Sequence, residues 1–223
     1  MMVSEALNAM DIVVCVSVSA ALGYLIGCIS PSYIIGLIKG YDVRSSGSKN
    51  AGASNTVLLA GKLAGLFVAI FDIFKATAAW KLAAYLFPQM RFAGMVGGVA
   101  CVLGHMFPVF LSFHGGKGFA CMGGLALAVS PKTFAIMFLV ALLIGIVTNY
   151  VAVSCAAMSV VWPMYYGLIT RHIVGAAILA IPAIPIFLKH MENFRRMREG
   201  TELRLSYLWH KDSELERIGH KEQ

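Results

Sequence analysis

The stretch Ile12–Ile38, IVVCVSVSAALGYLIGCISPSYIIGLI, contains no charged residue and exceeds the ~20 apolar residues with which a helix crosses a bilayer. Further apolar segments follow at Val57–Phe87, Phe92–Leu111, Phe119–Val129, Thr133–Val147, Val151–Leu168 and Ile173–Leu188. The pattern predicts an all-α integral membrane protein with about seven short transmembrane helices. The two segments between residues 119 and 147 also fit a single span that is kinked at Pro131.

The composition agrees with a bilayer as the solvent. Of the 223 residues, 59% are hydrophobic and 13% are charged, which is about half the charged fraction of a soluble domain. A water-soluble core could not hide so much apolar surface. We expect one polytopic domain at residues 1–200 and a charged cytoplasmic tail at residues 201–223.

Lysine and arginine in the short loops predict the orientation in the membrane. With seven spans, one side holds Lys39, Arg44, Lys49, Lys62, Lys117 and the group Arg195, Arg196 and Arg198. The other side holds Arg91, Lys132 and Arg171, together with an acidic N-terminus. The more basic side is expected in the cytoplasm, which places the N-terminus outside and the C-terminus inside. Nearly every polar cluster lies in the loops 39–56, 112–118 and 148–150 and at the start of the tail. In this orientation all of these face the cytoplasm.

The placement of charge also bears on the partners. The net charge is +7, but Lys189–Gln223 is nearly neutral, and the excess lies in loops and helix ends between Lys39 and Arg171. No soluble module carries a basic patch, which argues against nucleic-acid binding. An anionic substrate or an anionic lipid surface fits better.

The first polar cluster, Gly47-Ser48-Lys49-Asn50-Ala51-Gly52-Ala53-Ser54-Asn55, comes directly before an apolar segment. Its small residues let the backbone approach a ligand, and the N–H groups at the following helix start favour an anion. Ser54 or Asn55 could equally be an ordinary N-cap, and the local residues alone favour that interpretation.

The second cluster is Gly104-His105-Met106-Phe107-Pro108-Val109-Phe110, followed by Phe113-His114-Gly115-Gly116-Lys117-Gly118-Phe119. A lysine ammonium beside permissive backbone suits a phosphate group. The cluster is no Walker loop, because the GxxxxGK[ST] spacing is absent. The alternative is a tight turn whose lysine reaches the lipid headgroups, but the density of glycine favours a binding site.

Two further groups of polar residues lie at helical spacing. His190 and Asn193 share one face of a helix, which could present an imidazole and an amide to a hydroxyl or a phosphate. A basic helix that leaves the membrane is the alternative. Asp72 and Lys75 lie inside an apolar segment, three positions apart, and could neutralise one another as a functional or a structural pair.

These clusters, in this order and on one membrane face, resemble the bacterial acyl-phosphate:glycerol-3-phosphate acyltransferases, the PlsY family. The family pattern looks like GSGNxGATN, DxxK, GHxFPVFxxFKGGKG, RYVSL and HRENIxRLxxGxE. The matching segments are Gly47–Asn55, Asp72 with Lys75, Gly104–Gly118, Asn149–Val153 and His190–Glu202. The likeness runs from about Gly23 to Gly200 and is most specific in the middle motif.

The resemblance implies an enzyme of the bacterial cytoplasmic membrane that uses no metal, no cofactor and no coenzyme A. Such enzymes transfer a fatty acyl group from acyl phosphate to the 1-hydroxyl of sn-glycerol 3-phosphate, which gives lysophosphatidate and phosphate for phospholipid synthesis. The expected partners are these two substrates and the lipid bilayer, and the oligomeric state stays open.

The resemblance also implies roles for individual residues. Lys117, His190 and Asn193 would be catalytic, with Lys117 between both substrates and the other two holding glycerol 3-phosphate. The residues that bind a substrate phosphate would be Ser48, Asn50, Gly52, Ser54, Asn55, Gly115, Gly116 and Gly118. A metal site made from His105, His114 and His190 lacks carboxylates at a fitting spacing, so we expect no metal.

The chain departs from the family pattern at several positions. The arginine after the GATN stretch is replaced near Leu58, and Asn149 and Ala152 replace the arginine and the serine of RYVSL. These changes remove positive charge where glycerol 3-phosphate would be held. Lys62 and Ser154 are candidates to bind the acceptor instead; otherwise the acceptor differs from glycerol 3-phosphate.

A small transporter or channel for an anionic, phosphorylated solute is the main alternative from another class. A transporter of that kind should show repeated broken helices with polar groups near the midplane. Here no internal repeat is visible, and the polar groups gather on one face. The chain also lacks the HxxxxD box of other acyltransferases and the Asp-rich box of CDP-alcohol phosphotransferases.

Overall fold

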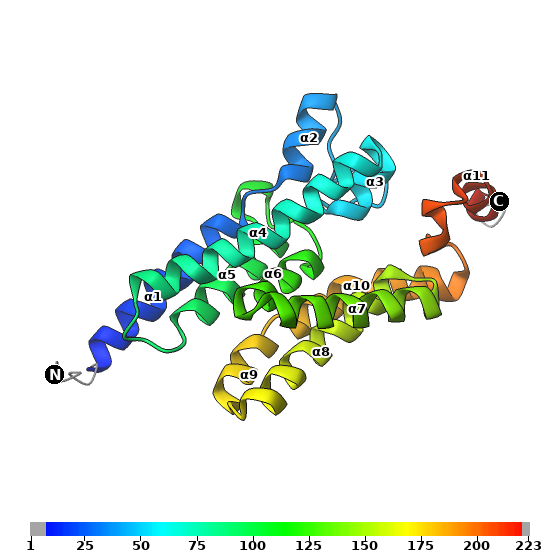
Figure 1. Cartoon of the computed structure of the whole chain (residues 1–223). Helices are drawn as coiled ribbons and strands as arrows, with labels where there is room; N and C mark the ends of the chain where they lie inside the picture. Colours follow the sequence, from blue (N-terminus) through cyan, green and yellow to red (C-terminus); the bar gives the residue numbers. More distant parts are fainter. Residues whose placement is uncertain (1–7, 220–223) are drawn as a thin grey trace. The chain divides into compact units, whose positions relative to one another are not determined.

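The computed structural model describes residues 8–219, which are entirely helical apart from loops and turns (Figure 1). Six stretches are long and apolar enough to cross a membrane: Ala9–Lys39, Lys62–Leu86, Ala93–Leu111, Pro131–Thr148, Val151–Thr170 and Ile173–Glu199. Phe119–Val129 is a shorter apolar helix. The prediction of an all-α, multi-pass membrane chain is therefore confirmed, with six candidate spans in place of about seven.

The chain divides into two compact units, one that ends at Pro131 and one that begins at Lys132. The first unit contains α1 (Ala9–Gly27), α2 (Pro31–Lys39), α3 (Ala53–Ala60), α4 (Lys62–Leu86), α5 (Ala93–Met106), the 3-10 turn η1 (Val109–Leu111) and α6 (Phe119–Val129). Helix α4 packs against α5 and α6, and α2 and α3 lie beside α4 (Figure 1). The predicted single domain at residues 1–200 stays a prediction.

Two of the apolar segments of this unit are each broken into two helices. Helix α1 ends at Gly27, and α2 begins at Pro31 with Ser30 as its N-cap, whose hydroxyl accepts a hydrogen bond from the backbone N–H of Tyr33. Proline is favoured in the first helical turn because its missing N–H is not needed there. The second break is at Gly61, whose φ of +94° separates α3 from α4.

The loop between α6 and α7 (Pro131–Thr148) is a single residue, Ser130, whose backbone is extended. Helix α6 therefore ends at Val129, and Pro131 begins a new helix, as proline commonly does. The chain is thus broken at Pro131, and whether α6 and α7 make one crossing or two stays a prediction.

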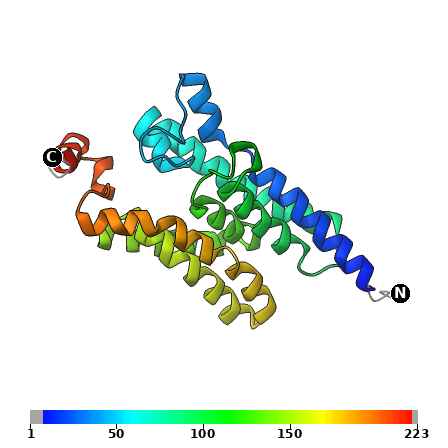
Figure 2. The same ribbon diagram turned by 180° about the vertical axis from the view of Figure 1, so that it is seen from behind.

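Glycine brings the backbones of α1 and α5 into direct contact. A Cβ atom added to Gly23 would lie 2.0 Å from the carbonyl oxygen of Gly97, and one added to Gly27 would lie 2.2 Å from that of Cys101. On the facing helix, a Cβ added to Gly104 would lie 2.2 Å from the carbonyl oxygen of Tyr24. Helices in membranes associate through such small residues. We name these contacts the α1–α5 seam; the two helices run side by side in both views (Figures 1 and 2).

The second unit contains α7, α8 (Val151–Thr170), α9 (Ile173–Ala180), α10 (Ala183–Glu199), the 3-10 turn η2 (Leu205–Leu208) and α11 (Lys211–Gly219). Helix α8 packs against α9 and α10 (Figure 2), and the hydroxyl of Ser154 on α8 donates to the carbonyl oxygen of Ala141 on α7, 2.8 Å away. Pro182 separates α9 from α10, so the segment predicted at Ile173–Leu188 is also two helices. The described part of the predicted tail contains η2 and α11.

Candidate functional site

The side chain of Asn55 organises the first polar loop. It is fully buried, its Oδ1 accepts a hydrogen bond from the backbone N–H of Ser48 at 2.8 Å, and its Nδ2 donates to the carbonyl oxygens of Val43 and Ser46. The N-cap of α3 is Gly52, so the interpretation of Ser54 or Asn55 as the cap is wrong. Asn55 closes the loop instead.

The other residues predicted in this loop lie around that closure. Ser48 and Asn50 are half-buried, Gly52 is buried, and Ser54 is exposed. Lys49, where the family pattern has glycine, adopts a φ of +55°. This left-handed conformation is one that glycine favours, which gives the physical reason for the family's residue.

The second cluster forms a tight turn that lies on His105. The backbone N–H groups of Gly115 and Gly116 donate to the carbonyl oxygens of Met106 and His105, respectively. A Cβ atom on Gly116 would lie 2.1 Å from Nε2 of His105, so no other residue fits without moving that ring. Gly118 has a φ of +86° and is the N-cap of α6. Half-buried Lys117 therefore lies next to the N–H groups of a helix start, which favour an anion.

The first loop and this glycine turn come together. A Cβ atom on Gly52 would lie 3.9 Å from the Cα atom of Gly116, which is ordinary van der Waals contact. The two clusters that the sequence placed sixty or so positions apart thus form one polar region of the amino-terminal unit, at the starts of α3 and α6.

Beneath the glycine turn lies a buried charged cluster. The Nζ atom of Lys75 is 2.7 Å from Oδ1 of Asp72, an ion pair without the alignment of a hydrogen bond. The same ammonium donates to the carbonyl oxygen of Ile29, 2.7 Å away in the break between α1 and α2, and lies 3.1 Å from Nδ1 of His105. Nδ1 of His105 is 3.4 Å from Oδ1 of Asp72. The ion pair that the sequence predicted is therefore present, and it contacts the histidine that carries the glycine turn.

This cluster also contains atoms that bind metals in other proteins. Ligand atoms of Asp72, His105 and Cys121 lie within 4.8 Å of one another, and all three residues are buried. The position beside the carboxylate is taken by the Lys75 ammonium. A metal ion there would face a fixed positive charge, so these residues do not fit one. His114 is exposed, with its Nδ1 2.6 Å from the carbonyl oxygen of Ser112.

In the carboxy-terminal unit, His190 and Asn193 are both buried on α10. Nδ1 of His190 lies 2.8 Å from the carbonyl oxygen of Ile186, an acceptor, so Nδ1 carries the hydrogen. The Nδ2 atom of Asn193 donates to Oε1 of Glu202 at 2.6 Å. Both side chains are thus held in fixed orientations by neighbours in the same unit.

The remaining candidates have varied surroundings. Ser154 is buried and donates to a backbone carbonyl, so its hydroxyl serves helix packing here, and a role in acceptor binding stays a prediction. Lys62 is exposed at the start of α4. Ala152 is buried. Asn149 bonds to the segment after α10, a contact that no pattern in the sequence predicts.

Three residues that matter to these sites were missed from the sequence. His105 belongs to the second cluster, but its contact with Asp72 and Lys75 joins separate helices, and no spacing in the sequence predicts it. Glu202 and Arg217 belong to the predicted tail, yet both bond to the end of α10. The glutamate at the end of the HRENIxRLxxGxE pattern was the one available signal.

Comparison with known proteins shows a match to the family described as glycerol-3-phosphate acyltransferase, over residues 17–200. The chain is 34% identical over 205 residues to glycerol-3-phosphate acyltransferase 1 of Oceanobacillus iheyensis, covering 87% of this chain and 97% of that protein. It is 33% identical over 186 residues to glycerol-3-phosphate acyltransferase of Geobacter sulfurreducens, covering 82% and 94%.

Solved structures give the same result. The crystal structure of PlsY (YgiH), an integral membrane glycerol 3-phosphate acyltransferase, in its glycerol 3-phosphate form, matches with a TM-score of 0.79 and 31% identity. That match covers 86% of this chain and 96% of the other. The lysophosphatidic acid form of the same enzyme matches with a TM-score of 0.75.

Proposed function

Since the chain belongs to the glycerol-3-phosphate acyltransferase family, we propose that acyl transfer takes place at the glycine turn around Lys117. The protein is an integral membrane acyltransferase of phospholipid synthesis. The alternative of a transporter is therefore set aside. The proposal concerns the donor, the residues that act and the side of the membrane.

The proposed donor is an acyl phosphate, and the proposed acceptor is glycerol 3-phosphate, as in the name of the structural relative. An acyl phosphate is a mixed anhydride and is already activated, so no covalent enzyme intermediate is required. The enzyme has to hold two anions together and stabilise the charge that develops as the acyl group moves. A lysine, backbone N–H groups and a helix start are suited to that task.

One observation carries the assignment: Gly115 and Gly116 pack directly on His105, which leaves Lys117 at the start of α6. We assign to Lys117 the contact with both substrates. The phosphate of one substrate would bind between this turn and the loop of Ser48, Asn50, Gly52 and Ser54. Asn55 would act through that loop, since its amide is bonded to three backbone groups.

His190 and Asn193 are proposed to hold glycerol 3-phosphate. A buried imidazole whose Nδ1 carries the hydrogen leaves Nε2 as the nitrogen that accepts from a hydroxyl group. The phosphate of one of the substrates is proposed to take the proton of the attacking 1-hydroxyl. Lys62 and Ser154 stay as proposed contributors to acceptor binding.

The first test is the choice of donor. Purified protein with palmitoyl phosphate and glycerol 3-phosphate, in the presence of a chelator, is expected to release inorganic phosphate and form lysophosphatidate. Palmitoyl-coenzyme A in place of palmitoyl phosphate is expected to give no product, because the sequence lacks an HxxxxD box. Lysophosphatidate formed from the coenzyme A ester alone would contradict the proposed donor.

The second test concerns orientation. We propose that α6 is a seventh, short span in a bacterial cytoplasmic membrane, with the N-terminus outside and the polar loops and C-terminus in the cytoplasm. Fused after Gln223, a reporter that works only in the cytoplasm is expected to be active. Fused before Met1, a reporter that works only outside the cytoplasm is expected to be active. Six spans would put both termini on one side, so two reporters on the same side would refute the seventh span.

A further inference from the structure

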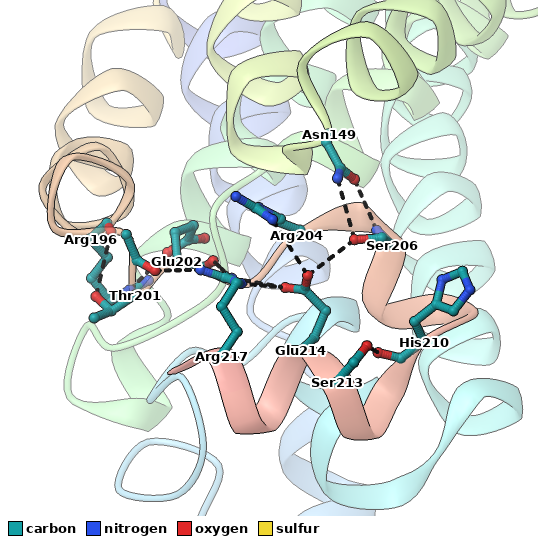
Figure 3. A network of polar contacts seen from close by, with 11 residues as sticks. Asn149, Arg196, Thr201, Glu202, Arg204, Ser206, His210, Ser213, Glu214 and Arg217 are labelled. Carbon is teal, nitrogen blue, oxygen red and sulfur yellow. Dashed lines mark hydrogen bonds and ion pairs between the residues drawn. The ribbon is translucent and has the colours of Figure 1, made fainter. Parts of the chain in front are cut away.

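Residues 201–219 lie beyond residues 17–200, which the family model matches, yet they are bonded into the carboxy-terminal unit. Figure 3 shows a network of polar contacts that includes Asn149 at one end and Arg196 at the other. The network passes through η2 and α11. Its members come from segments that the sequence separates by up to sixty-eight positions, Asn149 and Arg217.

At one end, Asn149 holds the segment that follows α10. Its backbone carbonyl accepts a hydrogen bond from the N–H of Leu205 at 2.7 Å, and its Oδ1 accepts from the N–H of Ser206 at 3.0 Å. Its Nδ2 donates to the hydroxyl of Ser206 at 3.3 Å. Asn149 has a φ of +60°, a conformation that asparagine tolerates better than most residues. Asparagine therefore suits this position both in its backbone and in its side chain.

In the middle of the network, Arg217 joins three groups. Its guanidinium donates to Oε2 of Glu214, to the carbonyl oxygen of Glu202 at 2.7 Å and to that of Gly200. Ser206 connects this part to Asn149, because its hydroxyl lies 3.4 Å from Oε1 of Glu214. Burial raises the pKa of Glu214, but the bonds from Arg217 outweigh it and hold that pKa below its usual value. Glu214 is therefore ionised at neutral pH and stays paired.

At the other end, Glu202 holds α10. Its Oε1 accepts from Nδ2 of Asn193 at 2.6 Å, and its Oε2 accepts from Nε of Arg196 at 2.8 Å. Glu202 is buried, with 8% of its surface exposed. A buried carboxylate between two fixed donors is a specific anchor, because a shift of either donor leaves one of its oxygens without a hydrogen bond. The bond also sets which way the carboxamide of Asn193 faces.

We propose that residues 205–217 form a brace that runs from Asn149 to Glu202 and holds the carboxamide of Asn193 in the orientation that binds glycerol 3-phosphate. This proposal rests on the proposed role of Asn193. Arg217 and Asn149 are positioning residues, since they act through Glu202 and touch no substrate. The brace also accounts for one departure from the family pattern. Asn149, which stands where the pattern has arginine, binds the segment after α10.

The test compares Arg217→Met with Arg198→Met in the purified full chain. The first variant loses the contacts of the brace, and the second loses an exposed arginine of α10 with the same change of charge. Arg217→Met is expected to raise KM for glycerol 3-phosphate about tenfold, as loss of a charged hydrogen bond would, while kcat and KM for palmitoyl phosphate stay within about twofold. Arg198→Met is expected to match the wild type. A lower melting temperature and kcat with an unchanged KM would overturn the proposal.

Two variants of Asn149 give a second, independent measurement. Asn149→Gly keeps the left-handed backbone but removes both side-chain bonds, and Asn149→Arg restores the family's residue. Both are expected to raise KM for glycerol 3-phosphate by several fold. If Asn149→Arg lowers that KM, the position is a lost substrate contact, and the brace is refuted.

The wild type separates this proposal from the one on which it rests. If the wild type forms no lysophosphatidate from palmitoyl phosphate and glycerol 3-phosphate, the proposed function fails. If the wild type is active and Arg217→Met and Asn149→Gly both leave KM unchanged, only the brace fails.

Discussion

Lys117→Ala is expected to lower the rate of acyl transfer by at least ~100-fold, the effect of losing an electrostatic contact with a transition state. The ammonium lies between two glycines at the start of α6, where negative charge from both substrates would gather. No other cation occurs in the Gly115–Gly118 turn. The measurement is phosphate release by the folded, detergent-purified variant at saturating palmitoyl phosphate and glycerol 3-phosphate.

Two further lysine variants sharpen that experiment. Lys117→Arg is expected to lose most activity as well, because a planar guanidinium is bulkier than a compact ammonium and the turn is bounded by a buried histidine. Lys132→Ala removes an exposed lysine at the start of α7 and serves as the control, with near-normal activity expected. If Lys117 only reaches the lipid headgroups, the alanine variant will fold and transfer acyl groups at a near-normal rate.

Lys75→Met is expected to destabilise the protein by ~3–5 kcal/mol, because it leaves the buried carboxylate of Asp72 without its cation. It also removes the donor to the carbonyl oxygen of Ile29 in the break after α1. Asp72→Asn is expected to have a similar effect, since it leaves the buried ammonium unpaired. The measurement is thermal unfolding of the purified variants in one detergent.

The double variant Asp72→Asn with Lys75→Met provides the decisive comparison. It removes both charges, so much of the stability lost in each single variant is expected to return. Lys81→Met, an exposed lysine on the same helix, is the control and should unfold close to the wild type. If the double variant loses as much stability as the two single variants together, the two charges do not depend on one another.

The membrane-helical class was predictable because apolar composition is a local property of each segment. The breaks inside three of these segments were not. Ser30 and Pro31 lie within an uncharged run, and hydropathy does not register that a proline starts a new helix. Gly61 is equally inconspicuous in sequence, although its φ of +94° ends α3.

The candidate site shows the same division between local and tertiary information. The Asp72–Lys75 pair followed from i,i+3 spacing on one helix, and the structure confirms it. The contact of His105 with that pair joins α4 to α5, and no spacing in the sequence encodes it. Asn55 had the right residue type for a cap, but its amide bonds to a loop that lies before α3.

The charge pairs after residue 200 could not be predicted for a related reason. The nearly neutral mixture of charges there is typical of a solvated segment, and the sequence gives no sign of which charges pair. Arg217 meets the backbone of Gly200 and Glu202 only because the chain reverses after α10. At Asn149 the sequence shows only that an arginine of the family pattern is absent, whereas the amide has partners of its own.

At the α1–α5 seam, entry of a helix into the bilayer and packing of one helix on another favour different residues. Entry of a helix into the bilayer depends on the summed affinity of its side chains for lipid, whereas assembly at Gly23, Gly27 and Gly104 depends on the absence of side chains. Leucine at any of these positions would favour entry and at the same time hold the two helices apart. At these positions a more hydrophobic residue therefore favours insertion and opposes helix packing. Hydrophobicity alone does not predict the stability of the folded protein.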